Sequence, residues 1–347
     1  MRLVMLAATG GIMSTGNWAA VEHMHVAFVT CAELPQLDED TRRLIAPLAL
    51  RGVRVTPVVW DHSDVVWTDF DLVVVRSCWD YVPRRSQFLE WARRVPQLAN
   101  SAPILIWNTD KCYLRDLEDC GVSVVPTTWL KPEETWTAPV TGTWVIKPAA
   151  SMASLDTGRY RMDYSDQRQL ALKHVRRLQA AGRVVMVQPY LVGIEDDGEM
   201  ALVYLHGMFS HAVRKGPVLT GPDEGIDRRF QPQGGLNLQL RRPTTAQFTM
   251  ADRVLAAVPG GRDTLLYARV DLVPDEDGNP VLMELELTEP QLYLGYDPDA
   301  ADRMAAAISV RAGAERSARV SRVAKQREYG TAMLVAPPRF EVLDKST

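Results

Sequence analysis

Two glutamates that alternate with leucines form the most specific chemical pattern in the chain. In MELELTEP, residues 283–290, Glu284 and Glu286 would point to one face of a β-strand. Unpaired carboxylates are costly to bury, so this face must meet water or a cation. Alternation alone fits a solvated sheet face as well as a metal site. Glu289 lies off that face, so we expect it to end the strand, near a substrate at most, and not to bind metal.

Asp271 supplies a third carboxylate, from the preceding expected strand. The turn sequence DEDGN joins the two strands as a hairpin, so Asp271 can face Glu284 and Glu286. Three oxygen donors suit Mg²⁺, which completes its shell with water and phosphate oxygens. Arg269 lies two residues before Asp271 on the same strand face. Its guanidinium could stabilise an oxyanion or simply pair with these carboxylates.

Lys147 lies within an apolar strand, WVIKPAA, where its ammonium must meet an anion. The loop that follows is rich in small residues, so its backbone N–H groups and the hydroxyls of Ser151 and Ser154 can approach a phosphate. Lys111 opens an earlier helix, and for this residue alone a solvated ammonium is the favoured alternative. The sequence has no GxxxxGK phosphate loop.

The stretch VQPYLVGIEDDGE, residues 187–199, predicts an extended linker between two lobes. Such a linker can offer backbone groups to an adenine edge, and Glu195 or Glu199 could accept ribose hydroxyls. The alternative for EDDG is a plain surface turn. Arg214 and Lys215 end a later strand, where either could reach a phosphate or substrate, or remain solvated.

A substrate pocket is expected at RSCWDY, which follows a strand at the carboxyl edge of a parallel sheet. Arg76 could clamp a carboxylate, Asp80 could bind an amine, and Trp79 and Tyr81 could form walls. An aromatic cap on the core is the alternative for Trp79. The expected substrate-binding residues are Arg76, Ser77, Trp79, Asp80 and Tyr81.

Alternating strands and helices predict that residues 24–108 form a Rossmann-like half with a parallel sheet. Strands are expected at 25–30, 53–60, 70–77 and 103–108, and helices at 37–52 and 84–95.

The pattern then changes to a helix at 109–121, a strand at 142–150 and a helix at 165–182 that Ser165 would cap. An antiparallel meander is expected at 184–190, 199–206 and 208–215, followed by a Gly- and Pro-rich loop at 216–243. Further helices are expected at 244–258 and 298–312, around the hairpin at 265–273 and 280–287.

Composition narrows the class of protein. The 347 residues carry a formal net charge of −4, which argues against a general nucleic-acid binder. No apolar run approaches the roughly 20 residues of a membrane helix. The four cysteines form no CxxC pair and are expected to be reduced thiols in a cytoplasmic protein. The first strand lacks the GxGxxG that a dinucleotide oxidoreductase would need.

Together these motifs resemble the ATP-grasp superfamily of carboxylate–amine ligases, in its glutathione synthetase and ribosomal-S6-modifying branch. The resemblance covers about residues 24–310 and rests on the order NTDKCYLRDLEDCGVSVVPTTW, WVIKPAA, VQPYL…GEMALVY, ARVDLV and LMELELTEP. In VVVRSCWDY, FSHAVRKGP and MELELTEPQLYLG the chain is similar to cyclo-ligases of the D-cycloserine synthetase kind, which close O-ureido-D-serine into cycloserine.

The resemblance implies an α/β fold in which a Rossmann-like domain precedes two α+β subdomains that clasp ATP. Lys111 and Lys147 would bind phosphates, assisted by Ser151 and Ser154. Gln188 and the backbone of Tyr190 and Leu191 would meet adenine, and Glu199 or Glu195 ribose. Asp271, Glu284 and Glu286 would hold Mg²⁺, while Arg269, Lys215 and Arg214 would act on the reacting groups. The superfamily commonly has Asn where this chain has Glu286, and the extra charge should tighten divalent binding.

The expected activity is therefore ATP-dependent carboxylate–nitrogen ligation through an acyl phosphate, with an amino-acid-like substrate. Intramolecular ring closure in antibiotic biosynthesis is the first expectation. An intermolecular amino-acid ligase and a non-catalytic nucleotide-binding protein are the alternatives. Neither nucleic acid nor membrane is an expected partner, and the chain would assemble as a homodimer or homotetramer. The expected divisions are a 1–23 extension, then 24–108, 109–190, 191–312 and a 313–347 tail.

Overall fold

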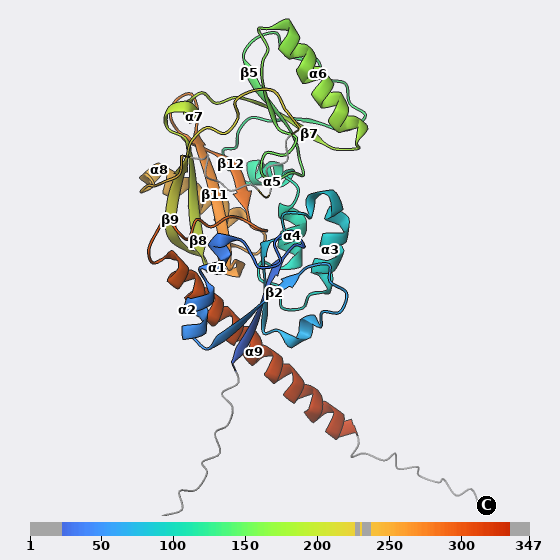
Figure 1. The fold of residues 1–347 in the computed structure, drawn as a ribbon, viewed down its shortest axis with the longest axis vertical. Coiled ribbons are helices and arrows are strands. Elements are labelled where there is room, and N and C mark those ends of the chain that lie inside the picture. Colours follow the sequence, from blue (N-terminus) through green and yellow to red (C-terminus); the bar gives the residue numbers. More distant parts are fainter. Residues whose placement is uncertain (1–22, 226–229, 231–236, 334–347) are drawn as a thin grey trace, which may run out of the picture.

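The computed structural model describes residues 23–225, 230 and 237–333, so the expected extension lies almost wholly outside the described part (Figure 1). The first unit contains a parallel sheet in the order β2–β1–β3, formed by β1 (Met24–Thr30), β2 (Val53–Val59) and β3 (Leu72–Ser77). Valines and Phe28 on both faces of β1 and β3 are fully buried, as both-sided covering of a parallel sheet requires. The first three expected strands are confirmed.

The fourth expected strand is wrong, because residues 103–108 belong to helix α4 (Ala102–Asn108). A short apolar run does not distinguish a buried strand from a buried helix, and here Pro103 lies in the first turn, where its fixed φ favours a helix. The place beside β3 is taken instead by a single bridge from Val73 to Leu98. Helix α3 (Arg85–Arg94) precedes α4.

The expected helix at 37–52 is divided into α1 (Glu39–Arg42) and α2 (Ile45–Leu50). The Asp38 side chain caps α1 by accepting from the Thr41 backbone N–H, and Gly52 follows α2 with a φ of 69°. Short 3-10 turns lie at Trp67–Asp69, Val82–Arg84 and Arg262–Thr264.

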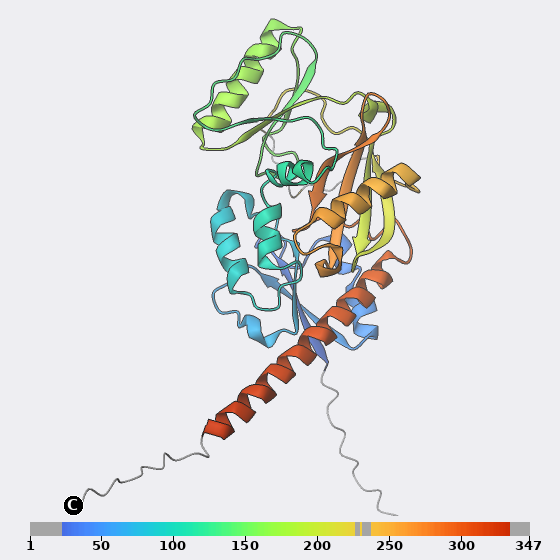
Figure 2. The same cartoon turned by 180° about the vertical axis from the view of Figure 1, so that it is seen from behind.

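The second sheet is antiparallel, in the order β4–β7–β5–β6, and α6 (Ser165–Ala180) packs on it (Figure 2). Its strands are β4 (Thr128–Leu130), β5 (Thr143–Pro148), β6 (Gly158–Arg161) and β7 (Val185–Pro189). Helix α5 (Tyr113–Asp119) begins after Lys111, which therefore precedes the helix that it was expected to open. Tyr164, not Ser165, occupies the N-cap position of α6, and no side chain caps it.

The third sheet is antiparallel, in the order β10–β9–β8–β11–β12, with α8 (Thr245–Ala257) packed against β11 and β12. Its strands are β8 (Glu199–Leu205), β9 (Met208–Lys215), β10 (Gln239–Leu240), β11 (Tyr267–Pro274) and β12 (Pro280–Glu286). The expected hairpin is confirmed, and a register shift between Asp271 and Leu272 places Asp271 opposite Glu284 and Arg269 opposite Glu286. EDDG contains the end of a helical turn, α7 (Gly193–Asp196).

Helix α9 (Ala300–Met333) runs as one element of 34 residues, so the expected end near residue 312 is wrong. Ala and Arg are good helix formers, and the two glycines, Gly313 and Gly330, do not break the run. The helix crosses the base of the molecule and packs on β1, β3 and β8, and its C-terminal half extends past the body (Figures 1 and 2). Arg319 anchors it by an ion pair of 2.5 Å to Asp71. Among the described helices, none is long and apolar enough to cross a membrane.

Candidate active site

One cavity of about 630 Å³ collects residues from all three units. Trp79 and Tyr81 come from the first unit, Lys147 from the second sheet and Asp271 from the third. The sequence-predicted residues that line it are Tyr81, Trp79, Lys111, Lys147, Ser151, Ser154, Gln188, Tyr190, Leu191, Glu199, Lys215, Arg269, Asp271, Glu284 and Glu286. Segments far apart in the sequence thus meet at one site.

Cations contact each of the hairpin carboxylates. The Arg269 guanidinium donates to Asp271 at 2.8 Å and also pairs with Glu286. The Lys215 ammonium lies 2.9 Å from Asp271 and pairs with Glu199 as well. In this arrangement no group of three His, Cys, Asp or Glu side chains converges to hold a metal ion within the described residues. A hard divalent cation nevertheless fits the donor set, since Asp271 and Glu284 are cross-strand partners.

Burial and these pairs set the protonation of the carboxyl groups. Burial raises the pKa of Glu286 to about 7, although Arg269 opposes the rise. Burial likewise raises the pKa of Glu199 to about 7, against the effect of Lys215. For Asp271 burial acts in the same direction, but Arg269 and Lys215 outweigh it and hold the pKa well below its usual range. Asp271 is therefore the fixed anion of the site.

Both predicted phosphate-binding lysines are buried, with 6% of Lys111 and 8% of Lys147 exposed, so neither is solvated as the alternative required. Lys111 Nζ lies 3.1 Å from Glu284 and donates to the Ser151 carbonyl at 2.7 Å. Lys147 Nζ instead contacts the Met283 sulfur at 3.9 Å, and no carboxylate of the described residues lies within 4 Å of it. Burial lowers the pKa of Lys147 to about 8. Of the described carboxylates, none thus forms an ion pair with this ammonium in the cavity.

Of the two glutamates proposed to bind ribose, Glu195 and Glu199, only Glu199 lines the cavity. Gln188 lines the cavity and donates from Nε2 to Thr127 at 2.8 Å. Glu195 lies outside the lining residues, where it accepts from the Tyr190 hydroxyl at 2.7 Å and pairs with Arg159 at 2.6 Å. Glu199 faces the cavity, so it is the better placed of the two.

Four other predicted residues do not line the cavity. Arg76 donates to the Pro290 carbonyl at 3.0 Å, and Ser77 shares a hydrogen bond of 3.0 Å with Thr30. Asp80 accepts from Trp60 Nε1 at 2.9 Å and pairs with Arg84. Arg214 donates to the Asp196 and Asp197 carbonyls. These side chains are occupied by protein partners, so their predicted contacts with substrate stay predictions.

Several lining residues had no strong sequence signal. Glu289, Thr288, Gln291 and Tyr293 follow the acidic strand, and Pro217–Thr220 form part of the loop after β9. Asn108 links the end of α4 to β12 and the residues after it. Its Nδ2 donates to the Leu285 carbonyl at 2.7 Å, while its Oδ1 accepts from the Leu287 N–H at 2.8 Å. The asparagine ahead of Lys111 in NTDK was the one available clue to this link.

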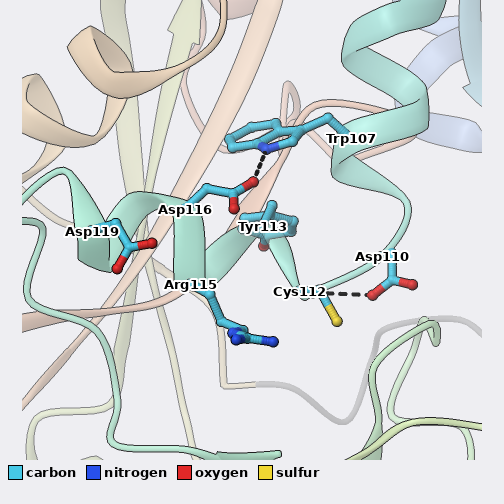
Figure 3. A pocket seen from close by; sticks show the side chains of 7 residues that line it. All are labelled: Trp107, Asp110, Cys112, Tyr113, Arg115, Asp116 and Asp119. Carbon is cyan, nitrogen blue, oxygen red and sulfur yellow. Dashed lines mark hydrogen bonds between the residues drawn. The ribbon is translucent and has the colours of Figure 1, made fainter.

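A separate polar pocket of about 360 Å³ lies beside α5 and contains none of the predicted site residues (Figure 3). Asp116 accepts from Trp107 Nε1 at 2.7 Å, and Asp110 accepts from the Cys112 N–H at 3.0 Å. We assign no catalytic role to this pocket.

Comparison with known proteins identifies the family. A family model described as D-cycloserine synthetase DcsG, N-terminal domain, matches residues 26–102. The cycloserine biosynthesis protein DcsG of Streptomyces lavendulae is 33% identical over 307 residues, which are 82% of this chain and 98% of that protein. The chain belongs to the D-cycloserine synthetase family of ATP-grasp ligases.

The crystal structure of D-cycloserine synthetase DcsG matches this family member with a TM-score of 0.73 and 32% identity, over 83% of this chain and 99% of the other. The D-alanine–D-alanine ligase of Bacillus anthracis matches with a TM-score of 0.58 over 85% and 99% of the two chains. At 14% identity that match shows the fold alone. The protein is thus an ATP-grasp ligase and uses ATP, and the prediction of the superfamily is confirmed.

Proposed function

We propose that this ligase phosphorylates a carboxylate of an amino-acid-like substrate with ATP and that a nitrogen nucleophile then displaces the phosphate. The observation that carries the proposal is the buried Lys147 ammonium, which faces the cavity without a carboxylate within 4 Å in the described residues. A cation so placed favours an anionic ligand, and Lys111 lies in the same cavity. Both lysines suit the phosphates of ATP.

The other residues around the cavity fit the remaining parts of the nucleotide. Gln188 and the backbone of Tyr190 and Leu191 would receive adenine, and Glu199 would receive ribose. Asp271, Glu284 and Glu286 would hold Mg²⁺, which when bound neutralises charge on the phosphates. The guanidinium of Arg269 and the ammonium of Lys215 would then be free to meet negative charge that develops on substrate oxygens. Because no side chain need act as a nucleophile, catalysis rests on positioning and charge neutralisation.

Intramolecular closure of a small ring, in antibiotic biosynthesis, is the reaction that we favour. Its support is the 33% identity to a cycloserine biosynthesis protein over most of both chains. The alternative is ligation of two amino acids, which a fold shared with D-alanine–D-alanine ligase also permits. ADP release with O-ureido-D-serine alone would support closure, whereas release only with pairs of amino acids would support the alternative. The expected homodimer or homotetramer and the cytoplasmic location stay predictions.

Glu286→Ala tests the proposed metal site. We expect Mg²⁺-dependent ADP release to fall by at least about tenfold, since even indirect partners of a metal ligand contribute that much to affinity. The Mg²⁺ affinity of the ADP-bound protein, measured by titration calorimetry, should weaken in parallel. Glu276→Ala, in the exposed turn of the same hairpin, is the control and should leave both quantities unchanged. Unchanged turnover of Glu286→Ala at low Mg²⁺ would reject Glu286 as a ligand.

A further inference from the structure

Glu289 differs from the other acidic residues of the cavity. It lies three positions after Glu286, beyond the end of β12, and its side chain lines the same space. The aromatic residues that wall this end are Trp79 and Tyr81, and Trp79 Nε1 lies 3.4 Å from the Glu289 carbonyl. Glu289 therefore belongs to the end of the cavity that the first unit closes, away from the adenine-side linker.

Among the described residues, no cation forms an ion pair with the carboxyl group of Glu289. Glu199, Asp271, Glu284 and Glu286 each contact Lys111, Lys215 or Arg269. By contrast, no Lys, Arg or His nitrogen within the described ranges lies within 4 Å of Glu289. Its Oε2 atom is shielded from solvent and has no hydrogen-bond partner among the described residues, although the Tyr81 side chain interacts with the carboxyl group. Such an atom is costly to leave unsatisfied, so a ligand that supplies a donor would be stabilised here.

The charges around Glu289 indicate which kind of ligand fits. Burial raises the pKa of Glu289 to about 8, and the neighbouring charge of Glu286 adds to the rise. Lys111 opposes the rise only in part. A carboxyl among other carboxylates attracts a cation more strongly than a neutral donor, and the cation in turn favours its ionised form. An ammonium group meets this requirement.

We propose that Glu289 binds the ammonium group of the substrate and so selects an amino acid over a simple carboxylic acid. This inference rests on the proposed function, because it places the substrate carboxylate near Glu286 and Arg269. An α-amino acid carries its ammonium and carboxylate on adjacent carbons, so the two groups can meet neighbouring parts of one cavity. Glu289 thereby takes the part that the sequence had suggested for Asp80, whose carboxylate is held by Arg84 and Trp60.

The test compares Glu289→Gln with Glu276→Gln, a substitution of the same kind in the exposed hairpin turn. Titration with ADP and Mg²⁺ first establishes that both variants fold and bind nucleotide like the wild type. The Kd of O-ureido-D-serine is then measured in the presence of Mg²⁺ and a non-hydrolysable ATP analogue. We expect it to rise by about 10- to 100-fold in Glu289→Gln, the usual effect of losing a hydrogen bond to a charged group. Glu276→Gln should bind like the wild type.

The matched ligand 3-(ureidooxy)propanoate lacks the amino group and should bind the wild type more weakly than O-ureido-D-serine does. Its Kd should be the same for the wild type and Glu289→Gln, because Glu289 has no ammonium to bind in this ligand. An equal loss for both ligands, or a Kd for O-ureido-D-serine within twofold of wild type, would overturn the inference. A panel of D-serine, L-serine, D-alanine and their des-amino acids, with hydroxylamine as an added nucleophile, separates the two proposals. Equal rates of ADP release with the amino acids and their des-amino acids would overturn the role of Glu289 but not the proposed function. No ADP release with any carboxylate would overturn the proposed function as well.

Discussion

Charge balance differs sharply between neighbouring side chains of the cavity. Asp271 has two cationic partners, Arg269 and Lys215, and only 1% of it is exposed. Breaking such a buried pair by removing one partner typically costs about 3–5 kcal/mol, so this network has a structural as well as a chemical role. Lys147 and Glu289 stand at the opposite extreme, with charge that the protein leaves without a close ion-pair partner among the described residues. A bound ligand should therefore change the electrostatic surroundings of these two side chains most.

The lowered pKa of the single residue Lys147 leads us to expect that ADP binding depends on pH in the absence of metal. With its pKa lowered to about 8, the free protein loses the Lys147 proton as pH rises through 8. Only the ammonium attracts phosphate, so the Kd of ADP should increase between about pH 7.5 and 9.5, by at most tenfold per pH unit. Glu199 and Glu286, whose pKa values are about 7, are mostly ionised over this range. Glu289, whose pKa is about 8, also ionises within it, so Lys147 accounts for the part of the pH dependence that a Lys147 variant removes.

Calorimetric titration of ADP in EDTA measures this effect. Lys147→Arg should bind ADP with little change over the same range, because arginine keeps its charge. Lys147→Met should bind weakly and with a smaller pH dependence than the wild type, while Lys131→Met, at an exposed position, should follow the wild type. A flat wild-type profile would contradict the assignment of Lys147 to phosphate.

At the scale of elements, the segment after β9 connects two sheets across the cavity. Pro217–Thr220 line the cavity, and the segment is then held to β6 because the Arg159 N–H donates to the Gly221 carbonyl at 2.8 Å. The Asp223 N–H donates to the Tyr160 hydroxyl at 3.3 Å, and Arg177 pairs with Asp223 at 2.5 Å. The third sheet thus reaches the second sheet through this segment, beside the cavity in which we propose that the nucleotide binds.

Gly158 is the position in β6 where this contact is closest. A Cβ atom there would lie 2.6 Å from the Asp223 backbone nitrogen and 2.6 Å from the Tyr160 hydroxyl. Gly158→Ala should therefore displace the segment, lower the free energy of unfolding by about 1–3 kcal/mol and weaken ADP–Mg²⁺ binding. Urea denaturation and calorimetry measure the two effects. Gly221→Ala, where a Cβ meets nothing within 4 Å, is the control, and equal behaviour of the two variants would exclude this packing argument.

At the scale of the whole molecule, the cavity depends on three units that approach one another. Trp79, Lys147 and Asp271 belong to separate sheets or their connections, yet they line one space. A nucleotide bound there contacts the folded arrangement and has no equivalent site in the unfolded chain. Binding should therefore stabilise the whole protein.

We expect ADP with Mg²⁺ at 100 times its Kd to raise the free energy of unfolding by about 2.7 kcal/mol. In EDTA the same ADP concentration should give a smaller increase, and Glu286→Ala should lose the difference between the two conditions. Urea denaturation followed by fluorescence of the nine tryptophans measures the shift. Equal stabilisation with and without Mg²⁺ in the wild type would argue against a metal between protein and phosphate.

The sequence by itself determined the features that depend on neighbours along the chain. Alternation placed Glu284 and Glu286 on one face, and the short DEDGN turn made the strand of Asp271 and Arg269 their partner. A register shift between Asp271 and Leu272, which the sequence did not predict, brings Asp271 opposite Glu284. In a hairpin the partner strand follows from the short connection, whereas an irregularity such as a bulge can shift the register further along. The order of the motifs was enough to indicate the ATP-grasp fold.

Only the tertiary structure decided which side chains share the cavity. It turned Asp80 towards Arg84, made residues 103–108 a helix, and brought Glu289 beside Tyr81 in the lining. A side chain at a strand end is directed by whatever packs against it, and here the packing segments are distant in the sequence. The 3.4 Å contact from Trp79 to Glu289 joins residues that are 210 positions apart. Local periodicity carries no record of such contacts. The position of the Glu289 carboxyl, which forms no ion pair with the described residues, therefore follows only from the arrangement of the distant units.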